Sequence, residues 1–167
     1  MNNLAEHTIP SPVRPPARRH TAIPASQRFR CQDARWPDIV AALAELRAAK
    51  RCSVRIVDTD CGTGALLLCA VCHARALGFT AIEALGLNDI PALVDRARAA
   101  ATTVHDPAIG ITFESADLAS ALDGETDFPA DIVVWHGCKD GDAAVAQAVA
   151  AAGHTLIGDP ETTGAQA

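Results

Sequence analysis

The strongest constraint on the fold is a change of pattern between residues 53 and 79. The run SVRIVD (53–58) is short, rich in β-branched residues, and followed by a glycine turn. The run GALLLCAVCHARALGF (64–79) is too long for a strand and is typical of a buried helix. A strand that passes through a glycine turn into a helix begins a β–α–β unit, so we expect a parallel sheet.

The same alternation continues along the chain. Four further strands are predicted at 82–88, 109–117, 131–137 and 154–159, with helices from Asp33, at 91–104 and at 141–153. The predicted strands lack polar alternation, which is typical of a sheet covered on both faces. The sequence therefore predicts an α/β domain with a doubly wound, mostly parallel five-stranded sheet.

The first 30 residues differ from the rest in composition. They hold five prolines, and five arginines against one glutamate, which predicts an extended or disordered basic arm. With the whole chain at −6, the remainder carries −10, and this argues against a large phosphate-binding surface. We expect an arm over 1–30, a domain over 31–160 and a tail over 161–167. A solvated arm is favoured over one that binds nucleic acid or an acidic partner.

The cysteines and the apolar runs indicate a cellular compartment. Most of the six cysteines fall inside apolar runs, which suits reduced, buried thiols in a cytosol. No apolar stretch reaches the roughly 18 residues that cross a membrane, and no apolar signal segment precedes residue 30. We expect a cytoplasmic protein without a membrane segment.

Polar residues follow the ends of four predicted strands. In chain order these residues are Asp58 and Asp60, Asn88 and Asp89, Asp117, and His136. In a parallel sheet the carboxyl ends of the strands line one crevice, which is where ligands bind. The same residues could instead cap the helices that follow, but four strand ends in register favour a ligand site.

The glycine turn restricts the classes of ligand that the predicted site could bind. Gly62 and Gly64 permit a tight turn and a close approach of backbone to ligand. A dinucleotide fingerprint needs a third glycine where this chain has Leu67. No Gly-Lys-Ser/Thr follows the turn, which excludes a P-loop.

Four segments together resemble the class I S-adenosylmethionine-dependent methyltransferases. DTDCGTG (58–64) looks like that family's first motif, Asp-x-Gly-x-Gly-x-Gly, and GLNDIPALVDRAR (86–98) is similar to its second. ESADLASAL (114–122) and FPADIVVWHG (128–137) are similar to its third and fourth. The resemblance runs from Ser53 to Ile157 and implies a Rossmann-like fold that binds S-adenosylmethionine.

The resemblance also implies roles for single residues. Gly62 and Gly64 would meet the methionine part of the cofactor, and Asp58 would orient the loop or receive the ammonium group through water. Asn88 stands where the family's acid holds the ribose hydroxyls. Asp117 would accept from the adenine amino group and Leu118 would donate its backbone N–H to the ring. The cofactor-binding set implied in this way is Asp58, Asp60, Cys61, Gly62, Gly64, Asn88, Asp89, Asp117 and Leu118.

Two of these positions depart from the family pattern. Asp60 replaces the first glycine of the loop, where a carboxylate could attract the sulfonium or crowd the site. Asn88 offers one acceptor oxygen in place of a carboxylate, a loss of about 1 kcal/mol in binding. Asp89, next in the chain, could compensate by a small shift.

Cys69-Ala70-Val71-Cys72-His73 matches the spacing of a covalent haem-attachment site. The motif lies within the predicted helix 64–79, no export signal precedes it, and Met1 is the only methionine. No second paired cluster could complete a zinc site. We therefore predict core thiols and no metal, with a redox or haem protein as a weaker alternative.

The function implied by the resemblance is methyl transfer to an unidentified acceptor. His136 is a candidate base, although capping or solvent exposure is equally consistent with its position. The alternative is a non-catalytic, degenerate methyltransferase-like module that binds or interacts. The resemblance implies a strand hairpin after the fifth strand, which we expect this chain to lack. We therefore expect a homodimer or a partner along the exposed sheet edge.

Overall fold

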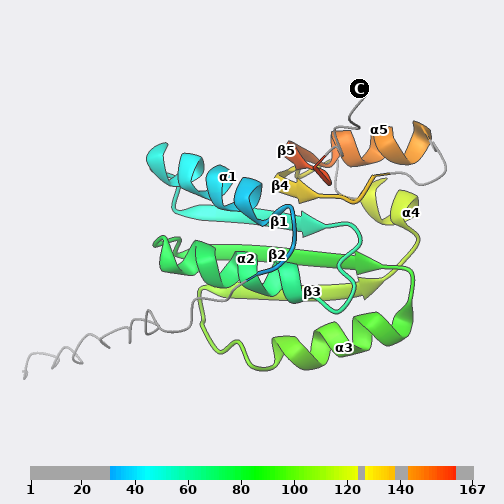
Figure 1. Ribbon diagram of the computed structural model, residues 1–167, viewed down its shortest axis with the longest axis horizontal. Helices are drawn as coiled ribbons and strands as arrows, with labels where there is room; N and C mark the ends of the chain where they lie inside the picture. Colours follow the sequence, from blue (N-terminus) through cyan, green and yellow to red (C-terminus); the bar gives the residue numbers. More distant parts are fainter. Residues whose placement is uncertain (1–30, 124–126, 138–142, 161–167) are drawn as a thin grey trace, which may run out of the picture.

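The computed structural model describes residues 31–123, 127–137 and 143–160. Five parallel strands form one sheet in the order β3-β2-β1-β4-β5, and helices connect them (Figure 1). In chain order the elements are α1 (Trp36–Ala48), β1 (Ser53–Asp58), α2 (Ala65–Ala76), β2 (Ala81–Asn88), α3 (Pro91–Ala101), β3 (Ile109–Ser115), α4 (Leu118–Asp123), β4 (Ala130–Val134), α5 (Ala143–Ala151) and β5 (Gly153–Ile157). The predicted doubly wound α/β architecture is confirmed.

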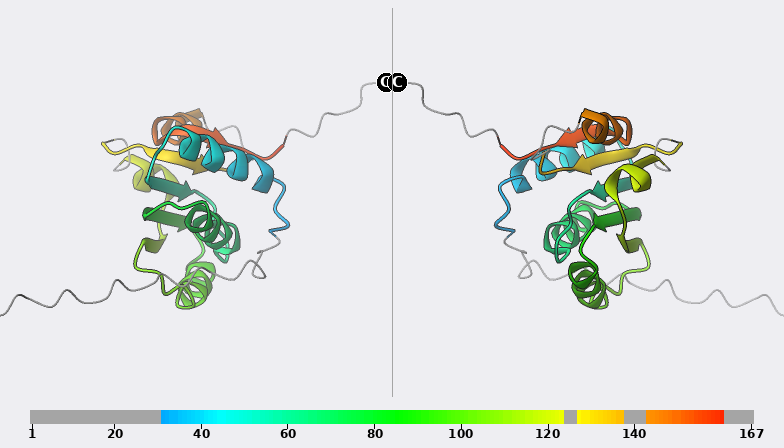
Figure 2. Two further views of the ribbon diagram at one scale, coloured as in Figure 1. Left: turned by 90° about the vertical axis from the view of Figure 1, so that its left-hand side faces the viewer. Right: turned by 90° about the vertical axis from the view of Figure 1, so that its right-hand side faces the viewer.

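Helices cover the sheet on both faces (Figure 2). The helices α1, α2 and α3 pack on one face, where the core contains Ile39, Ile56 and Phe113. The helices α4 and α5 pack on the other face around Val57 and Val133. Aromatic residues make up only 4% of the chain, so aliphatic side chains build most of both cores.

The register brings the carboxyl ends of the strands to one edge of the sheet. Asp58, the last residue of β1, pairs with Gly86 on β2 and with Val134 on β4. Asn88, the last residue of β2, pairs with Ser115 at the end of β3. The segments that follow β1, β2 and β3 therefore lie side by side, as the sequence predicts.

The helices α2 and α3 each end three residues earlier than predicted, at Ala76 and Ala101, and two further differences concern α4 and α5. The helix α4 was not predicted, because its start is signalled by a side-chain cap rather than by apolar periodicity. Asp117 Oδ2 accepts from the backbone N and the Oγ of Ser120, each at 3.0 Å. Gly153 was expected to close the helix over 141–153, but α5 ends at Ala151 and Gly153 begins β5. A Cβ at Gly153 would lie 2.4 Å from Val133 Cγ2, so the strand itself requires a glycine there.

The expected basic arm (1–30) and tail (161–167) lie outside the described residues, and the expected domain boundaries stay predictions. Within the described ranges, none of the helices combines the length and the apolar character that a membrane span requires.

The edge of the sheet at β5 supports a test of self-association. Within the described residues, β5 pairs only with β4, and Leu156 on this strand is 44% exposed. Exposed strand edges tend to pair with other chains. We expect sedimentation velocity to detect a dimer as the protein concentration rises, and Leu156→Lys to weaken it. A single monomer boundary at high concentration would contradict the expected homodimer.

Candidate functional site

The loop after β1 is fixed to the strands on both sides of it. Thr59 donates from its backbone N and from Oγ1 to the Val134 carbonyl, both at 3.0 Å. The backbone N of Cys61 donates to the Leu87 carbonyl at 2.9 Å. The loop is therefore fastened between β4 and β2 above the end of β1.

The two glycines of this loop serve different purposes. Gly62 has φ +53° and Gly64 has φ +78°, both in the left-handed region that favours glycine. A Cβ at Gly64 would lie 2.7 Å from Phe113 Cζ and 3.0 Å from Ala97 Cβ. A Cβ at Gly62 would meet no atom of the structure within 4 Å. The absence of a side chain at Gly64 thus allows the loop to pack against the core, whereas Gly62 borders open space.

Asp58 is a buried carboxylic acid in the middle of this edge of the sheet. It is 1% exposed, and among the described residues its Oδ1 has no hydrogen-bond partner. Burial raises its pKa from 3.8 to about 6, opposed by the charge of Arg35 and by a hydrogen bond from the backbone of Asp60. A buried carboxyl group with a raised pKa at the carboxyl ends of parallel strands is typical of a functional site.

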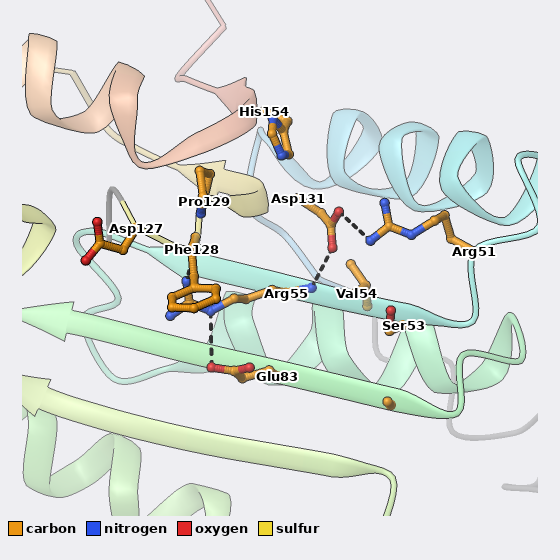
Figure 3. Close-up of a pocket in the computed structure, with 11 residues that line it drawn as sticks. Arg51, Ser53, Val54, Arg55, Glu83, Asp127, Phe128, Pro129, Asp131 and His154 are labelled. Atoms are coloured by element: carbon orange, nitrogen blue, oxygen red, sulfur yellow. Dashed lines mark hydrogen bonds and ion pairs between the residues drawn. The ribbon is translucent and has the colours of Figure 1, made fainter. Parts of the chain in front are cut away.

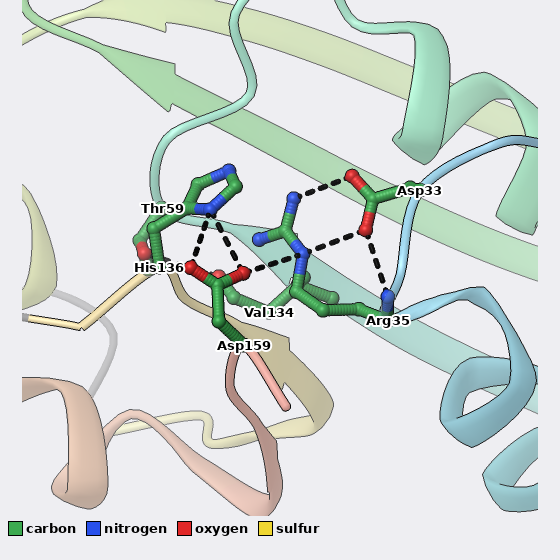
Figure 4. A network of polar contacts seen from close by, with 6 residues as sticks. All are labelled: Asp33, Arg35, Thr59, Val134, His136 and Asp159. Carbon is green, nitrogen blue, oxygen red and sulfur yellow. Dashed lines mark hydrogen bonds and ion pairs between the residues drawn. The ribbon is translucent and has the colours of Figure 1, made fainter. Parts of the chain in front are cut away.

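Arg35, which precedes α1, is a site residue that the sequence did not reveal. It is 2% exposed, and its guanidinium binds Asp33 through Nε at 2.9 Å and Nη2 at 2.8 Å (Figure 4). Its Nε also lies 3.6 Å from Asp159 Oδ1. Its Nη1 is buried and makes no hydrogen bond to the described part of the chain. The local pair with Asp33 does not by itself mark this arginine as buried, because Asp159, which lies beside it, comes from the far end of the domain.

His136 and Asp159 form a pair beside Arg35. The Nδ1 of His136 lies 3.0 and 3.1 Å from the two carboxylate oxygens of Asp159, and the imidazole is 37% exposed (Figure 4). An Nδ1–H that donates to a carboxylate leaves Nε2 as the acceptor of the neutral ring. Asp159, which follows β5, was not among the predicted site residues.

Asp60 and Asn88 contact each other directly. Asn88 Nδ2 donates to Asp60 Oδ1 at 2.7 Å, and Asn88 Oδ1 accepts from the backbone N of Ile90 at 2.9 Å. Asn88 is 4% exposed, whereas the Asp60 side chain is exposed. The two departures from the family pattern are therefore in contact with each other.

The remaining predicted residues lie around the same edge. Asp117 is exposed and caps α4, and its hydrogen bonds from Ser120 lower its pKa. Leu118 begins α4 and packs against the second core, and Asp89 is exposed. Cys61 is buried, and burial raises the pKa of its thiol to about 12, so its side chain faces the core rather than a ligand. Whether these residues bind a cofactor stays a prediction.

The cysteine motif of α2 belongs to the core. Cys69 is buried and Cys72 packs partly buried against the first core. Burial raises the pKa of the Cys69 thiol to about 12, so this thiol is protonated and unreactive at neutral pH. His73 is half-buried, with its ring edge-on to Trp36 at 5.4 Å. The prediction of a core thiol is confirmed for Cys69, whereas Cys72 lies at the edge of the core.

A cavity of about 410 Å³ lies at the opposite end of the sheet, near the starts of β1, β2 and β4 (Figure 3). Four of its charged residues are joined by hydrogen bonds: Arg51, Arg55, Glu83 and Asp131. Asp131 accepts from Arg51 Nη2 and from the backbone N of Arg55, both at 2.9 Å, and Arg55 Nε donates to Glu83 at 3.1 Å. These contacts hold the starts of the strands together, and the cavity is separate from the strand-end site.

Comparison with known proteins supports the fold. No protein-family model and no curated protein matches the chain. Magnesium protoporphyrin IX methyltransferase from Synechocystis with bound SAM is similar, with a TM-score of 0.52 and 19% identity over 75% of this chain and 58% of that chain. The same enzyme with bound SAH gives a TM-score of 0.51 and 20% identity, over 75% of this chain and 55% of that chain. This chain therefore covers less than two thirds of that enzyme. The chain has the Rossmann-like fold of the class I S-adenosylmethionine-dependent methyltransferases.

Proposed function

We propose that the domain binds S-adenosylmethionine at the carboxyl ends of β1, β2 and β3 and transfers its methyl group to an acceptor beside His136. One observation carries the proposal. In a chain with this fold, the glycine loop, Asn88 and Asp117 lie at one edge of the sheet. When bound, S-adenosylmethionine supplies an electrophilic methyl group on a positively charged sulfur.

The residues of the loop fit the methionine part of this cofactor. Asp58 Oδ1 is buried without a hydrogen-bond partner among the described residues, and Asp58 accepts a hydrogen bond from the backbone of Asp60, so its role in this site is to orient the loop. The open space at Gly62 leaves room for a ligand over the loop backbone. Asp117 uses one carboxylate oxygen to cap α4, which leaves the other for an adenine amino group.

His136 is the residue suited to handle a proton. Asp159 orients the ring through Nδ1, and Arg35 Nε lies 3.6 Å from the same carboxylate oxygen. Nε2 can then take a proton from an O–H, S–H or N–H acceptor as its heavy atom is methylated. A positioned base of this kind contributes roughly 10²- to 10⁴-fold to a rate. The pair favours an acceptor that must lose a proton.

A non-catalytic, methyltransferase-like binding module is the second candidate. The observation in its favour is that both ends of the Asn88 amide are already hydrogen-bonded within the protein. Such a module would keep the fold without a working ribose site.

Calorimetry tests the cofactor binding that the proposal requires and that a module without a working ribose site would lack. We expect S-adenosylmethionine and S-adenosylhomocysteine each to bind with one site per chain. Glu83→Gln, an exposed change at the far end of the sheet, should leave the affinity unchanged and serves as the control variant. If the folded protein gives no heat with either ligand at millimolar concentration, the proposed function is wrong.

A further inference from the structure

The contact between Asp60 and Asn88 assigns a new role to each. The amide orientation of Asn88 is determined by its partners, because the Ile90 N–H can only donate and the Asp60 carboxylate can only accept. Nδ2 therefore faces Asp60 and Oδ1 faces the start of α3. Asn88 is buried in this arrangement, so it is poorly placed to bind a ligand itself.

Asp60 has the properties that Asn88 lacks. Its side chain is exposed in the loop after β1, so a ligand can reach it. One of its oxygens is held by Asn88, and the other makes no hydrogen bond to a described residue. A carboxylate fixed through one oxygen can still accept hydrogen bonds from neighbouring hydroxyls.

In Rossmann-like domains an acid about 20 residues beyond the glycine loop accepts from the ribose hydroxyls. This chain has an amide at that place, on β2, and a carboxylate 2.7 Å from it, on the loop after β1. The negative charge is thus kept at nearly the same point of the sheet edge, although a different strand supplies it.

We infer that Asp60 is the residue that binds the ribose diol of an adenosyl ligand, and that Asn88 is a positioning residue that orients Asp60. The inference rests on the proposed function, because it concerns the same site. It also explains why two departures occur together: an acid at position 88 beside Asp60 would place two carboxylates in contact, and each would repel the other.

Isosteric exchange tests the assignment. The variants are Asp60→Asn, Asn88→Asp and the double exchange Asp60→Asn/Asn88→Asp, which restores one acid and one amide with the positions reversed. The probes are S-adenosylhomocysteine and its 2′-deoxyribose counterpart, measured by calorimetry at pH 8, with thermal unfolding to confirm that each variant is folded.

We expect Asp60→Asn to weaken S-adenosylhomocysteine binding by about tenfold or more, because a hydrogen bond to a charged group is lost. The preference for ribose over deoxyribose should fall with it. Asn88→Asp should also weaken binding, because two carboxylates in contact repel each other. The double exchange should stay weak, because its only acid would stand at the buried position 88.

Two results would overturn the inference. If the unmodified protein binds the probe and Asn88→Asp binds it more tightly, position 88 contacts the ribose and the inference alone fails. If no variant binds, including the unmodified protein, the proposed function fails as well.

Discussion

Replacing Asp58 with asparagine is expected to raise the free energy of unfolding at pH 7 by up to about 3 kcal/mol. Burial raises the pKa of this carboxyl from 3.8 to about 6, so ionising it disfavours the folded state. Asparagine has nearly the same shape and carries no charge. Its amide would still offer an oxygen to the backbone N–H of Asp60.

The expected effect of Asp58→Asn on the free energy of unfolding depends on pH. The folded state binds the Asp58 proton more tightly than the unfolded state does, so the protonated carboxyl stabilises the folded state. This contribution to the free energy of unfolding is fully present below about pH 3.8 and is lost as the pH rises through about 6. The difference in stability between Asp58→Asn and the unmodified protein should therefore grow between pH 4 and pH 6 and stay constant above. Comparing the two proteins cancels the opposite contribution of Asp33, whose pKa is lowered by its hydrogen bonds with Arg35.

Chemical denaturation from pH 4 to pH 8 measures this difference. Asp131→Asn is the matched control, since Asp131 is also buried but both of its oxygens hold hydrogen bonds, to Arg51 and Arg55. That variant is expected to lose stability. A loss of stability at pH 7 in Asp58→Asn, or a difference that does not vary with pH, would contradict the expectation. Asp58→Asn should also bind S-adenosylmethionine more weakly than the unmodified protein does, because residues that serve a binding site often lower the stability of the fold.

Replacing Gly64 with alanine is expected to destabilise the fold by about 2–5 kcal/mol. The left-handed backbone at φ +78° disfavours an L residue by roughly 1–2 kcal/mol. The new methyl group would also overlap the buried Phe113 ring, and overpacking of this kind costs about 1–3 kcal/mol. Phe113 cannot move aside easily, because its ring also fills the space above Gly86.

Gly62→Ala is the control that measures how much stability an alanine loses through the left-handed backbone conformation alone. It should destabilise by only about 1–2 kcal/mol, because the added methyl group enters open space at a similar φ of +53°. It should instead weaken ligand binding. Denaturation of both variants, and of Gly64→Ala combined with Phe113→Leu, measures the steric part. Equal destabilisation by the two alanines, with no recovery in the double variant, would show that packing against Phe113 is unimportant.

Local sequence patterns were sufficient for most of the architecture. The strands at 53–58, 82–88 and 154–159 lie within one or two residues of the observed β1, β2 and β5, because each is a short apolar run too short for a helix. The order of strands and helices then restricts the sheet to a doubly wound form. Since all strands run parallel, the sequence also predicts that the residues after β1, β2 and β3 share one edge.

The pairing of polar groups at that edge was decided only by the tertiary structure. Arg35 is buried because Asp33 and Asp159, which lie 126 positions apart in the chain, both approach it. Asp60 and Asn88 are 28 residues apart, and their contact depends on the register of β1 against β2. Charge, burial and hydrogen bonding at this site depend on which distant atoms come within about 3 Å, and residue periodicity carries no information at that scale.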